Sequence, residues 1–427
     1  MDKRFANLFG LTEEKAIAVL DTPQDRLGED DSRYIAASHL ASCPSDRAIA
    51  ALTRAIENTE SSLDNRIVRR KSMESLGRLQ AKSALPIVRT GLADDDCYTV
   101  EVAAWAIGEI GTEDAEILEE IAQLLEKPEQ LYRPIIHALA KLDYRPALER
   151  IRKHTHSEDE PTASAAIATI CRFTGDYSAM ARVVELLQHS SVNARRSCIQ
   201  DLIDAKYYTA LPNIARCPVS AIFRLRAIRL LAEAGLNSGE LSFEGIQPSL
   251  EKVLRDRPQD IDLVHEYDRP PTLDFAIGEL YQTDFGRCYL ASQTLIEKYP
   301  NEAPDALLAT YAKEAHNDYG AHYHVMKLLG WLRHAPAYDL LVKALHNPAP
   351  QFRKSRIAAA IALGELGEPR AIPELKTCLA TKIWDLKYAA LMALEQLGDL
   401  RDRALVTNDP DFLVRAKVKT LPNTVEQ

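Results

Sequence analysis

Glycines recur at nearly constant intervals in two parts of the chain, each within or after an Ala-, Ile- and Leu-rich stretch of helical periodicity. Gly77 and Gly108 lie 31 residues apart, and Gly330, Gly364 and Gly398 follow one another at intervals of 34 residues. A fixed period of this length is typical of repeat proteins, in which each unit packs only on its neighbours. We predict that these glycines end their helices, because glycine readily adopts the left-handed conformation of a helix C-cap.

Each repeat is predicted to contain two helices. After the glycine, a short turn leads into a second helix with a proline in its first turn, as at Pro86 and Pro373. A single helix pair cannot bury its apolar stripe, so stacked neighbours must complete the core. Strand signals are weak throughout. These features predict an all-α fold, an α-solenoid of HEAT-like helical-hairpin repeats that forms a curved superhelix.

The repeat register breaks at residues 236–303, where glycines and prolines cluster around the acidic, aromatic run 260–268. We therefore predict an N-terminal repeat array at residues 1–235, an irregular helical connector at 236–303 and a C-terminal array at 304–409. Residues 410–427 are polar and are predicted to form a loosely ordered tail.

Composition narrows the possible functions. The formal net charge of -10 disfavours a nucleic-acid binder, which needs a basic face. No apolar run is long enough to span a membrane and no signal peptide is evident, so we predict a cytoplasmic protein without a membrane span. The seven cysteines include no CxxC pair and are predicted to be buried thiols, not disulfides or metal ligands. Loop signatures of nucleotide-binding and hydrolytic enzymes are absent.

A predicted helix at residues 96–110 has an unusual polar face. Tyr98, Glu101 and Trp105 follow one another at helical spacing, opposite the apolar stripe. Aromatic rings beside a carboxylate suit a flat, conjugated, cationic ligand, which would stack on the rings and donate its N–H protons to the carboxylate. The alternative is that Tyr98 and Trp105 pack against the next repeat, and the pattern alone leaves both readings open.

A second predicted helix, at residues 317–333, carries ionisable groups. Asp318 and His322 are four residues apart, with Tyr319 beside them, and an aspartate can orient an imidazole and raise its basicity. A pair of this kind is more often a surface hydrogen bond than a catalytic dyad.

Basic residues cluster at Arg66, Arg69 and Arg70. An arginine near the start of such a helix commonly pairs with an acidic residue of a neighbouring repeat, which is the role we expect of Arg66 taken alone. The run Arg69-Arg70-Lys71 is in excess of the repeat pattern and could bind carboxylates.

Three stretches resemble the E/F family of phycobilin lyases, whose repeats are of the PBS-lyase type: residues 30–52, 65–88 and 94–112. The third is the most specific, because plain HEAT scaffolds rarely place Tyr98, Glu101 and Trp105 together. The likeness covers most of the chain, which resembles the one-chain members associated with phycoerythrin.

The resemblance implies a phycoerythrobilin lyase that binds a linear tetrapyrrole as substrate, with no permanent cofactor and no metal. Its partner would be a phycoerythrin α subunit, to whose cysteine the bilin is joined by a thioether. Some members also isomerise the bilin to phycourobilin, so lyase and lyase-isomerase both stay open. The other reading is a non-catalytic HEAT-repeat adaptor or chaperone for phycobiliprotein assembly.

For the lyase, Glu101 would hold the protonated pyrrole nitrogens, and Tyr98 and Trp105 would contact the bilin. Its propionates would be bound by Arg66, Arg69 and Arg70. Isomerisation would need a proton shuttle, for which Asp318, Tyr319 and His322 are the best-equipped group. The local string Ala321-His322-Tyr323-His324 lacks the His-Cys motif that describes some isomerising members.

Overall fold

The computed structural model describes residues 11–422, and this part of the chain is built from helices without any strand. The predicted all-α solenoid is therefore confirmed. The chain divides into two compact units, unit 1 at residues 1–180 and unit 2 at residues 181–427. The division lies at the start of α12 (Met180–Glu185). The predicted boundaries at 235 and 303 are of another kind, since they separate the repeat arrays from the connector and not one compact unit from another.

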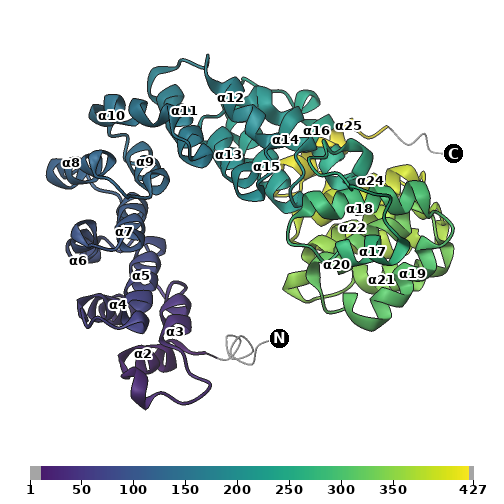
Figure 1. The fold of residues 1–427 in the computed structure, drawn as a ribbon. Helices are drawn as coiled ribbons and strands as arrows, with labels where there is room; N and C mark the ends of the chain where they lie inside the picture. The colour runs from purple at the N-terminus through teal and green to yellow at the C-terminus, as the bar shows by residue number, and fades with distance from the viewer. Residues whose placement is uncertain (1–10, 423–427) are drawn as a thin grey trace. The chain divides into compact units, whose positions relative to one another are not determined.

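Unit 1 consists of stacked helix pairs (Figure 1). One row is formed by α3, α5, α7, α9 and α11, each of which contacts the next, and shorter helices lie beside this row. The bounds of the helices are α2 (Glu13–Asp21), α3 (Arg33–Leu40), α4 (Asp46–Glu57), α5 (Leu63–Arg78), α6 (Leu85–Arg89), α7 (Cys97–Ile110), α8 (Ala115–Gln123), α9 (Tyr132–Lys141), α10 (Leu148–Arg152) and α11 (Glu160–Thr174). Pro86 lies in the first turn of α6, as predicted.

Unit 2 also consists of paired helices. They are α13 (Val192–Asp204), α14 (Leu211–Arg216), α15 (Ala221–Ser238), α16 (Phe243–Arg255), α17 (Leu273–Glu279), α18 (Phe285–Lys298), α19 (Ala303–Thr310), α20 (Tyr319–Trp331), α21 (Tyr338–Leu345), α22 (Arg353–Leu366), α23 (Ile372–Thr377), α24 (Trp384–Gln396) and α25 (Phe412–Thr420). The segment predicted as a connector contains α16, α17 and α18, and between α16 and α17 an irregular stretch at residues 261–272.

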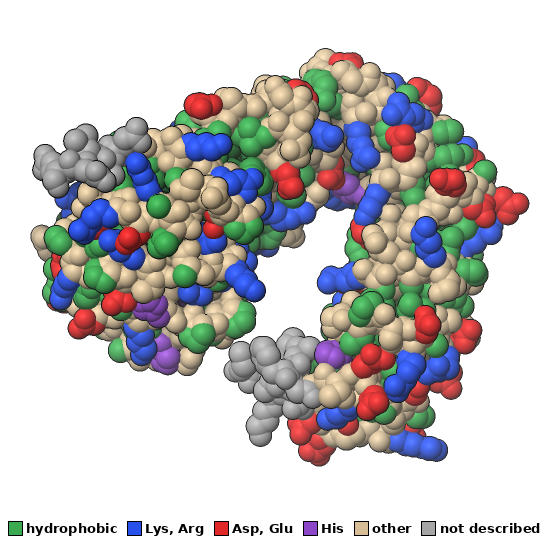
Figure 2. Space-filling view, turned by 180° about the vertical axis from the view of Figure 1, so that it is seen from behind, with side chains coloured by type: hydrophobic (Ala, Val, Ile, Leu, Met, Phe, Trp, Pro, Cys, Tyr) green, Lys and Arg blue, Asp and Glu red, His purple; other side chains and the backbone are tan. Residues whose placement is uncertain are grey.

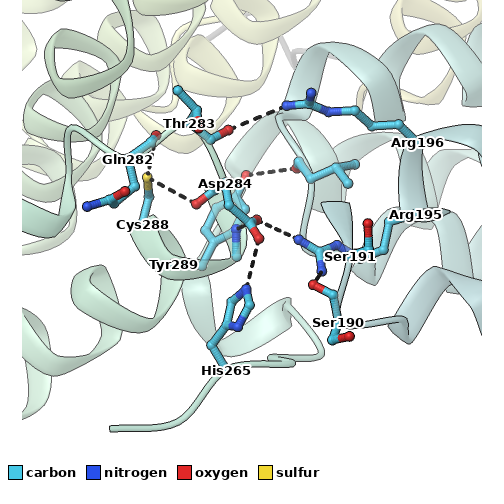
Figure 3. Close-up of polar contacts among 12 residues, drawn as sticks. Ser190, Ser191, Arg195, Arg196, His265, Gln282, Thr283, Asp284, Cys288 and Tyr289 are labelled. Atoms are coloured by element: carbon cyan, nitrogen blue, oxygen red, sulfur yellow. Dashed lines mark hydrogen bonds and ion pairs between the residues drawn. The ribbon is translucent and has the colours of Figure 1, made fainter. Parts of the chain in front are cut away.

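Asp284 attaches the irregular stretch and α18 to α13 (Figure 3). Its carboxylate caps α18 at the backbone N–H of Gly286 and accepts a hydrogen bond from the Arg195 guanidinium at 2.5 Å. The other carboxylate oxygen lies 2.9 Å from Nε2 of His265, in the irregular stretch. Arg195 is fully buried and also donates to the carbonyl of Ser190. One carboxylate therefore holds three segments that are distant in sequence.

The last helix of unit 2 packs back onto its early helices. Glu251 of α16 accepts a hydrogen bond from Lys417 of α25 at 3.0 Å and one from the Tyr388 hydroxyl of α24 at 3.4 Å. The prediction of a loose tail is wrong for α25, because Leu413 and Val414 are fully buried and Lys417 is only 2% exposed. A short apolar stripe and one buried ion pair order a segment whose composition is polar. Residues 423–427 lie outside the described residues.

The prediction that the repeated glycines cap helices is wrong for Gly77, Gly108, Gly330 and Gly364. These glycines lie inside helices, at the closest approach to an alanine of the next helix in the row. A Cβ on Gly330 would lie 2.6 Å from the Cα of Ala362, and similar contacts join Gly77 to Ala106, Gly108 to Ala138 and Gly364 to Ala393. The period therefore marks helix-to-helix contact, whereas the left-handed caps are mostly at other glycines, such as Gly175 and Gly367.

Substituting Gly330 tests this contact. We expect Gly330→Ala to destabilise unit 2 by about 1–3 kcal/mol, because the added methyl group overpacks against the backbone of Ala362. Gly278→Ala is the matched control, since Gly278 is exposed in α17 and its Cβ would meet nothing within 4 Å. The control is expected to be neutral or stabilising. Urea unfolding of both variants measures the difference, and an equal effect would contradict the contact.

Candidate functional site

The predicted face of α7 is present, but only part of it is open. Asp96 caps the helix by accepting a hydrogen bond from the N–H of Thr99 at 3.1 Å. The side chain of Tyr98 is 54% exposed, whereas Glu101 and Trp105 are half-buried. The indole of Trp105 packs over Gly77 of α5. Packing against a neighbouring repeat therefore describes Trp105, whereas the exposed ring of Tyr98 is compatible with ligand binding. Tyr98 is available to a ligand, and Trp105 largely joins two repeats.

Neighbouring acidic side chains already pair with two of the three predicted arginines on α5. Arg69 forms an ion pair with Asp94 at 3.2 Å, and Arg70 forms one with Asp96 at 2.6 Å. The guanidinium of Arg70 also lies over the Tyr98 ring, 5.2 Å from its centroid. Arg66 is exposed. Of the three, Arg66 is the one most accessible to a carboxylate, while Arg70 positions Asp96 and Tyr98.

Glu101 lies in an environment that favours its protonated form. Partial burial raises the pKa of its carboxyl group, and the negative charge of Asp96 raises this pKa further, against the opposing effect of the Arg70 guanidinium. A carboxyl group that holds its proton more tightly than an exposed glutamate is suited to exchanging a proton with a bound ligand. The sequence placed Glu101 on the same helix face as Tyr98 but did not predict its burial.

The predicted Asp–His pair does not form on α20. The Asp318 carboxylate caps the helix by accepting hydrogen bonds from the N–H groups of Gly320 and Ala321, at 2.8 and 2.7 Å. The His322 ring is buried against Phe352, and its Nδ1 has no hydrogen-bond partner among the described residues. Burial lowers the pKa of His322 to about 4, so the ring is neutral near pH 7. The expected orientation of the imidazole by aspartate is therefore absent.

The burial of His322 has a simple cause, because α20 is surrounded by protein. Every residue from Gly320 to Gly330 is buried, including both histidines and Lys327. The exception at its start is Tyr319, which is 58% exposed. The predicted residues thus form two groups, one on α5 and α7 of unit 1 and one on α20 of unit 2.

Sequence reasoning missed a pocket of about 510 Å³ in unit 2, beside Tyr319. Four cationic side chains line it, together with Tyr319 and Trp384: Arg226, Arg229, Arg353 and Lys354. Arg353 and Lys354 open a helix that matched the general repeat pattern, so they resembled repeat residues and not a site. A signal in the sequence was the presence of three basic residues among the four at 353–356, since one arginine is enough for the repeat.

The surface charges and the helix lengths can be compared with what nucleic-acid binding and membrane spanning require. On the face of unit 1 that Figure 2 presents, acidic and basic side chains lie beside one another, which differs from the single-sign track that a nucleic-acid backbone requires. Within residues 11–422, no helix is both long and apolar enough to cross a membrane.

Comparison with known proteins first identifies the class of fold. A model of HEAT repeats matches residues 351–421.

Over almost the whole length of both proteins, the chain is 61% identical to an "uncharacterized phycocyanin operon protein Y" of Pseudanabaena tenuis (98% of this chain and 99% of the relative).

Two further relatives have names that refer to bilins. The bilin biosynthesis protein CpeY of Synechococcus sp. is 31% identical, with 92% of this chain and 98% of the relative aligned. The bilin biosynthesis protein PecE of Mastigocladus laminosus is 28% identical over 54% of this chain and 87% of its own length. The chain belongs to the E/F-type phycobilin lyase family.

Proposed function

We propose that this protein is a bilin lyase, which binds phycoerythrobilin and attaches it through a thioether to a cysteine of a phycoerythrin α subunit. The observation that carries the proposal is the 31% identity to a bilin biosynthesis protein, because the match extends over 98% of that relative. The α7 face adds chemical support, since an exposed tyrosine and a half-buried carboxyl group lie together there.

The thiolate in this reaction comes from the acceptor subunit. Of the seven cysteines of the chain, five are buried, and burial raises the pKa of four of them to about 11 or 12: Cys171, Cys217, Cys288 and Cys378. Thiols in such surroundings are protonated at neutral pH and are poor nucleophiles. The acceptor sulfur adds to a carbon–carbon double bond of the bilin, a proton is taken up at the adjacent carbon, and no group leaves.

The work of the lyase is to hold the bilin in its electrophilic form. Glu101 shares its proton with the pyrrole nitrogens, so that positive charge on the conjugated system favours attack by sulfur. The Tyr98 ring supplies a flat surface for stacking, and Arg66 contacts a propionate.

Attachment without isomerisation is the form of the reaction that the unit 2 geometry favours. Isomerisation to phycourobilin needs a group that takes a proton from one carbon and another that returns it. His322 is only 1% exposed and Asp318 is engaged as a helix cap, so this pair is poorly placed to exchange protons with a bilin. Tyr319 is accessible, but alone it does not provide both steps.

Co-production of the chain with phycoerythrobilin and an acceptor subunit tests the proposal. We expect the purified phycoerythrin α subunit to carry covalent colour that survives acid denaturation, with the absorbance of attached phycoerythrobilin. A band at shorter wavelength would indicate a lyase-isomerase. Phycocyanin subunits serve as alternative acceptors. An absence of chain-dependent covalent colour on every acceptor would contradict the lyase and favour the adaptor or chaperone.

Replacing Glu101 tests the role of the α7 face. We expect Glu101→Gln to slow transfer about 10–100-fold, because the amide keeps the shape of the side chain but cannot exchange a proton. Glu113→Gln is the matched control, since Glu113 is exposed beyond the end of the same helix. Timed transfer to the acceptor is measured together with the circular dichroism of each variant. Equal transfer rates for the two variants would place the site elsewhere.

A further inference from the structure

The pocket in unit 2 lies among four helices and has the size and lining of a small-molecule site. Residues of α15, α20, α22 and α24 enclose about 510 Å³, within the range of roughly 300–1,000 Å³ that ligand pockets occupy. The aromatic rings of Tyr319 and Trp384 lie in its lining, and Tyr319 and the neighbouring Ile222 are partly exposed. The pocket is therefore reachable from the surface and offers flat rings for stacking.

Lys354 is a buried amine without an ion-pair partner among the described residues. The side chain is 7% exposed, and no carboxylate within residues 11–422 forms an ion pair with it. Its Nζ lies over three rings, 4.5 Å from the centroid of Phe285, 4.8 Å from that of Tyr319 and 5.1 Å from that of Tyr323. Ring contacts recover only part of the cost of burying a charge. An anion entering the pocket would supply the rest.

The other cations of the pocket differ in how far they are neutralised. Arg229 pairs with Asp411 at 2.7 Å, and Arg353 pairs with both oxygens of Asp385 at about 3 Å. The hydrogen-bond partner of Arg226 is the neutral amide of Gln200, at 2.8 Å. Arg226 thus resembles Lys354 in lacking a carboxylate partner among the described residues. Two of the four cations around one aromatic pocket are available to an anionic ligand.

We propose that this pocket is a second bilin site, separate from the α7 face, which binds the propionate side of another linear tetrapyrrole molecule: Lys354 and Arg226 contact its two carboxylates, and Tyr319 and Trp384 contact its conjugated rings. A flat molecule with two carboxylates matches both the aromatic lining and the two unneutralised cations. This inference rests on the proposed lyase function and adds a ligand site in unit 2 to the α7 face of unit 1.

Titration with phycoerythrobilin and with its propionate dimethyl ester tests the pocket. The ester retains the conjugated rings but has lost both negative charges. We expect the wild-type chain to bind the free acid at least about tenfold more tightly than the ester. Lys354→Met and Arg226→Gln should each weaken binding of the free acid about tenfold and leave binding of the ester unchanged. Lys343→Met, at an exposed position of α21, is the matched control and should change neither.

The outcomes separate the pocket from the lyase. Lys354→Met should keep or increase thermal stability, because an unpaired buried charge is removed, and Arg226→Gln replaces an exposed side chain. If the wild-type chain binds phycoerythrobilin and both variants keep its preference for the free acid, the pocket assignment is wrong and the lyase proposal stands. If the wild-type chain binds neither form, both proposals are wrong.

Discussion

Asp256→Asn is expected to lower the free energy of unfolding of unit 2 by about 3–5 kcal/mol. Asp256 is fully buried and accepts hydrogen bonds from Arg224 at 2.5 Å, Tyr323 at 2.5 Å and Tyr289 at 3.0 Å, as well as from Lys327. These partners come from α15, α18 and α20. Removing the negative charge leaves a buried guanidinium and a buried ammonium without compensation.

The energetics around Asp256 give this variant its large effect. The cations Lys327 and Arg224 hold the pKa of Asp256 well below its usual range, although burial alone would raise it. Burial lowers the pKa of Lys327 to about 8, against the attraction of Asp256. Without that attraction the ammonium loses its main support, so a second substitution, Lys327→Met, should partly restore the stability of Asp256→Asn.

Urea unfolding followed by tryptophan fluorescence measures the effect, because Trp331 and Trp384 report on unit 2. Asp21→Asn is the control, since its ion pair with Arg54 in unit 1 is largely exposed and contributes less than about 1 kcal/mol. A similarly small loss in Asp256→Asn would show that the buried cluster contributes little.

Unit 2 is also expected to lose stability as the pH falls from about 7.5 to 5. The pKa of His322 is lowered to about 4 by burial, and that of His324 is lowered well below its ordinary value for the same reason, with Lys327 and Lys354 adding to the effect. An unfolded chain protonates its histidines near pH 6.5, so it binds protons that the folded chain does not. The buried histidines therefore make their full contribution to the free energy of unfolding above pH 6.5, and this contribution is lost as the pH falls towards 4.

The magnitude is about 2 kcal/mol at pH 5 from His322, and His324 acts in the same direction. His322→Gln should show a pH dependence smaller by about that amount, since glutamine does not titrate. His346→Gln, at an exposed position of α21's C-cap, should retain the full dependence. Carboxylates with lowered pKa values lose their contribution mainly below pH 4–5, outside most of this interval. A flat profile between pH 7.5 and 5 would contradict the neutral burial of the histidines.

The repeat and its helices followed from local pattern, which is why the all-α solenoid could be predicted. Helical periodicity reports on residues three or four apart, and a fixed period reports on neighbouring repeats. The role of Gly330 was misread because a glycine near a helix end fits both a cap and a close helix contact. The two roles can be told apart only when the position of Ala362, 32 residues later in the chain, is known.

Contacts over long sequence separations could not be predicted from periodicity. The pairing of Glu251 with Lys417 depends on how several repeats stack within unit 2, and no local signal specifies it. The same stacking surrounds α20, so His322 is buried although its spacing from Asp318 favoured a hydrogen bond at the surface.

The candidate site was only partly visible in the sequence. Tyr98 and Glu101 were placed on one helix face, because their spacing alone determines this. Pairing with an acidic residue of the next repeat was expected of Arg66, whereas the structure shows it for Arg69 and Arg70. Lys354 was missed, since a buried amine without a carboxylate is recognisable only when its surroundings in three dimensions are known.

The most direct test of the lyase is a single-turnover transfer from the chain itself. The purified chain is loaded with phycoerythrobilin, separated from free pigment by gel filtration, and mixed with an acceptor subunit that carries no chromophore. We predict that the chain leaves the column coloured and that the bilin passes to one acceptor cysteine as a thioether, faster than from the same amount of free bilin. A chain that leaves the column colourless, or covalent labelling at the rate of free bilin, would contradict the account.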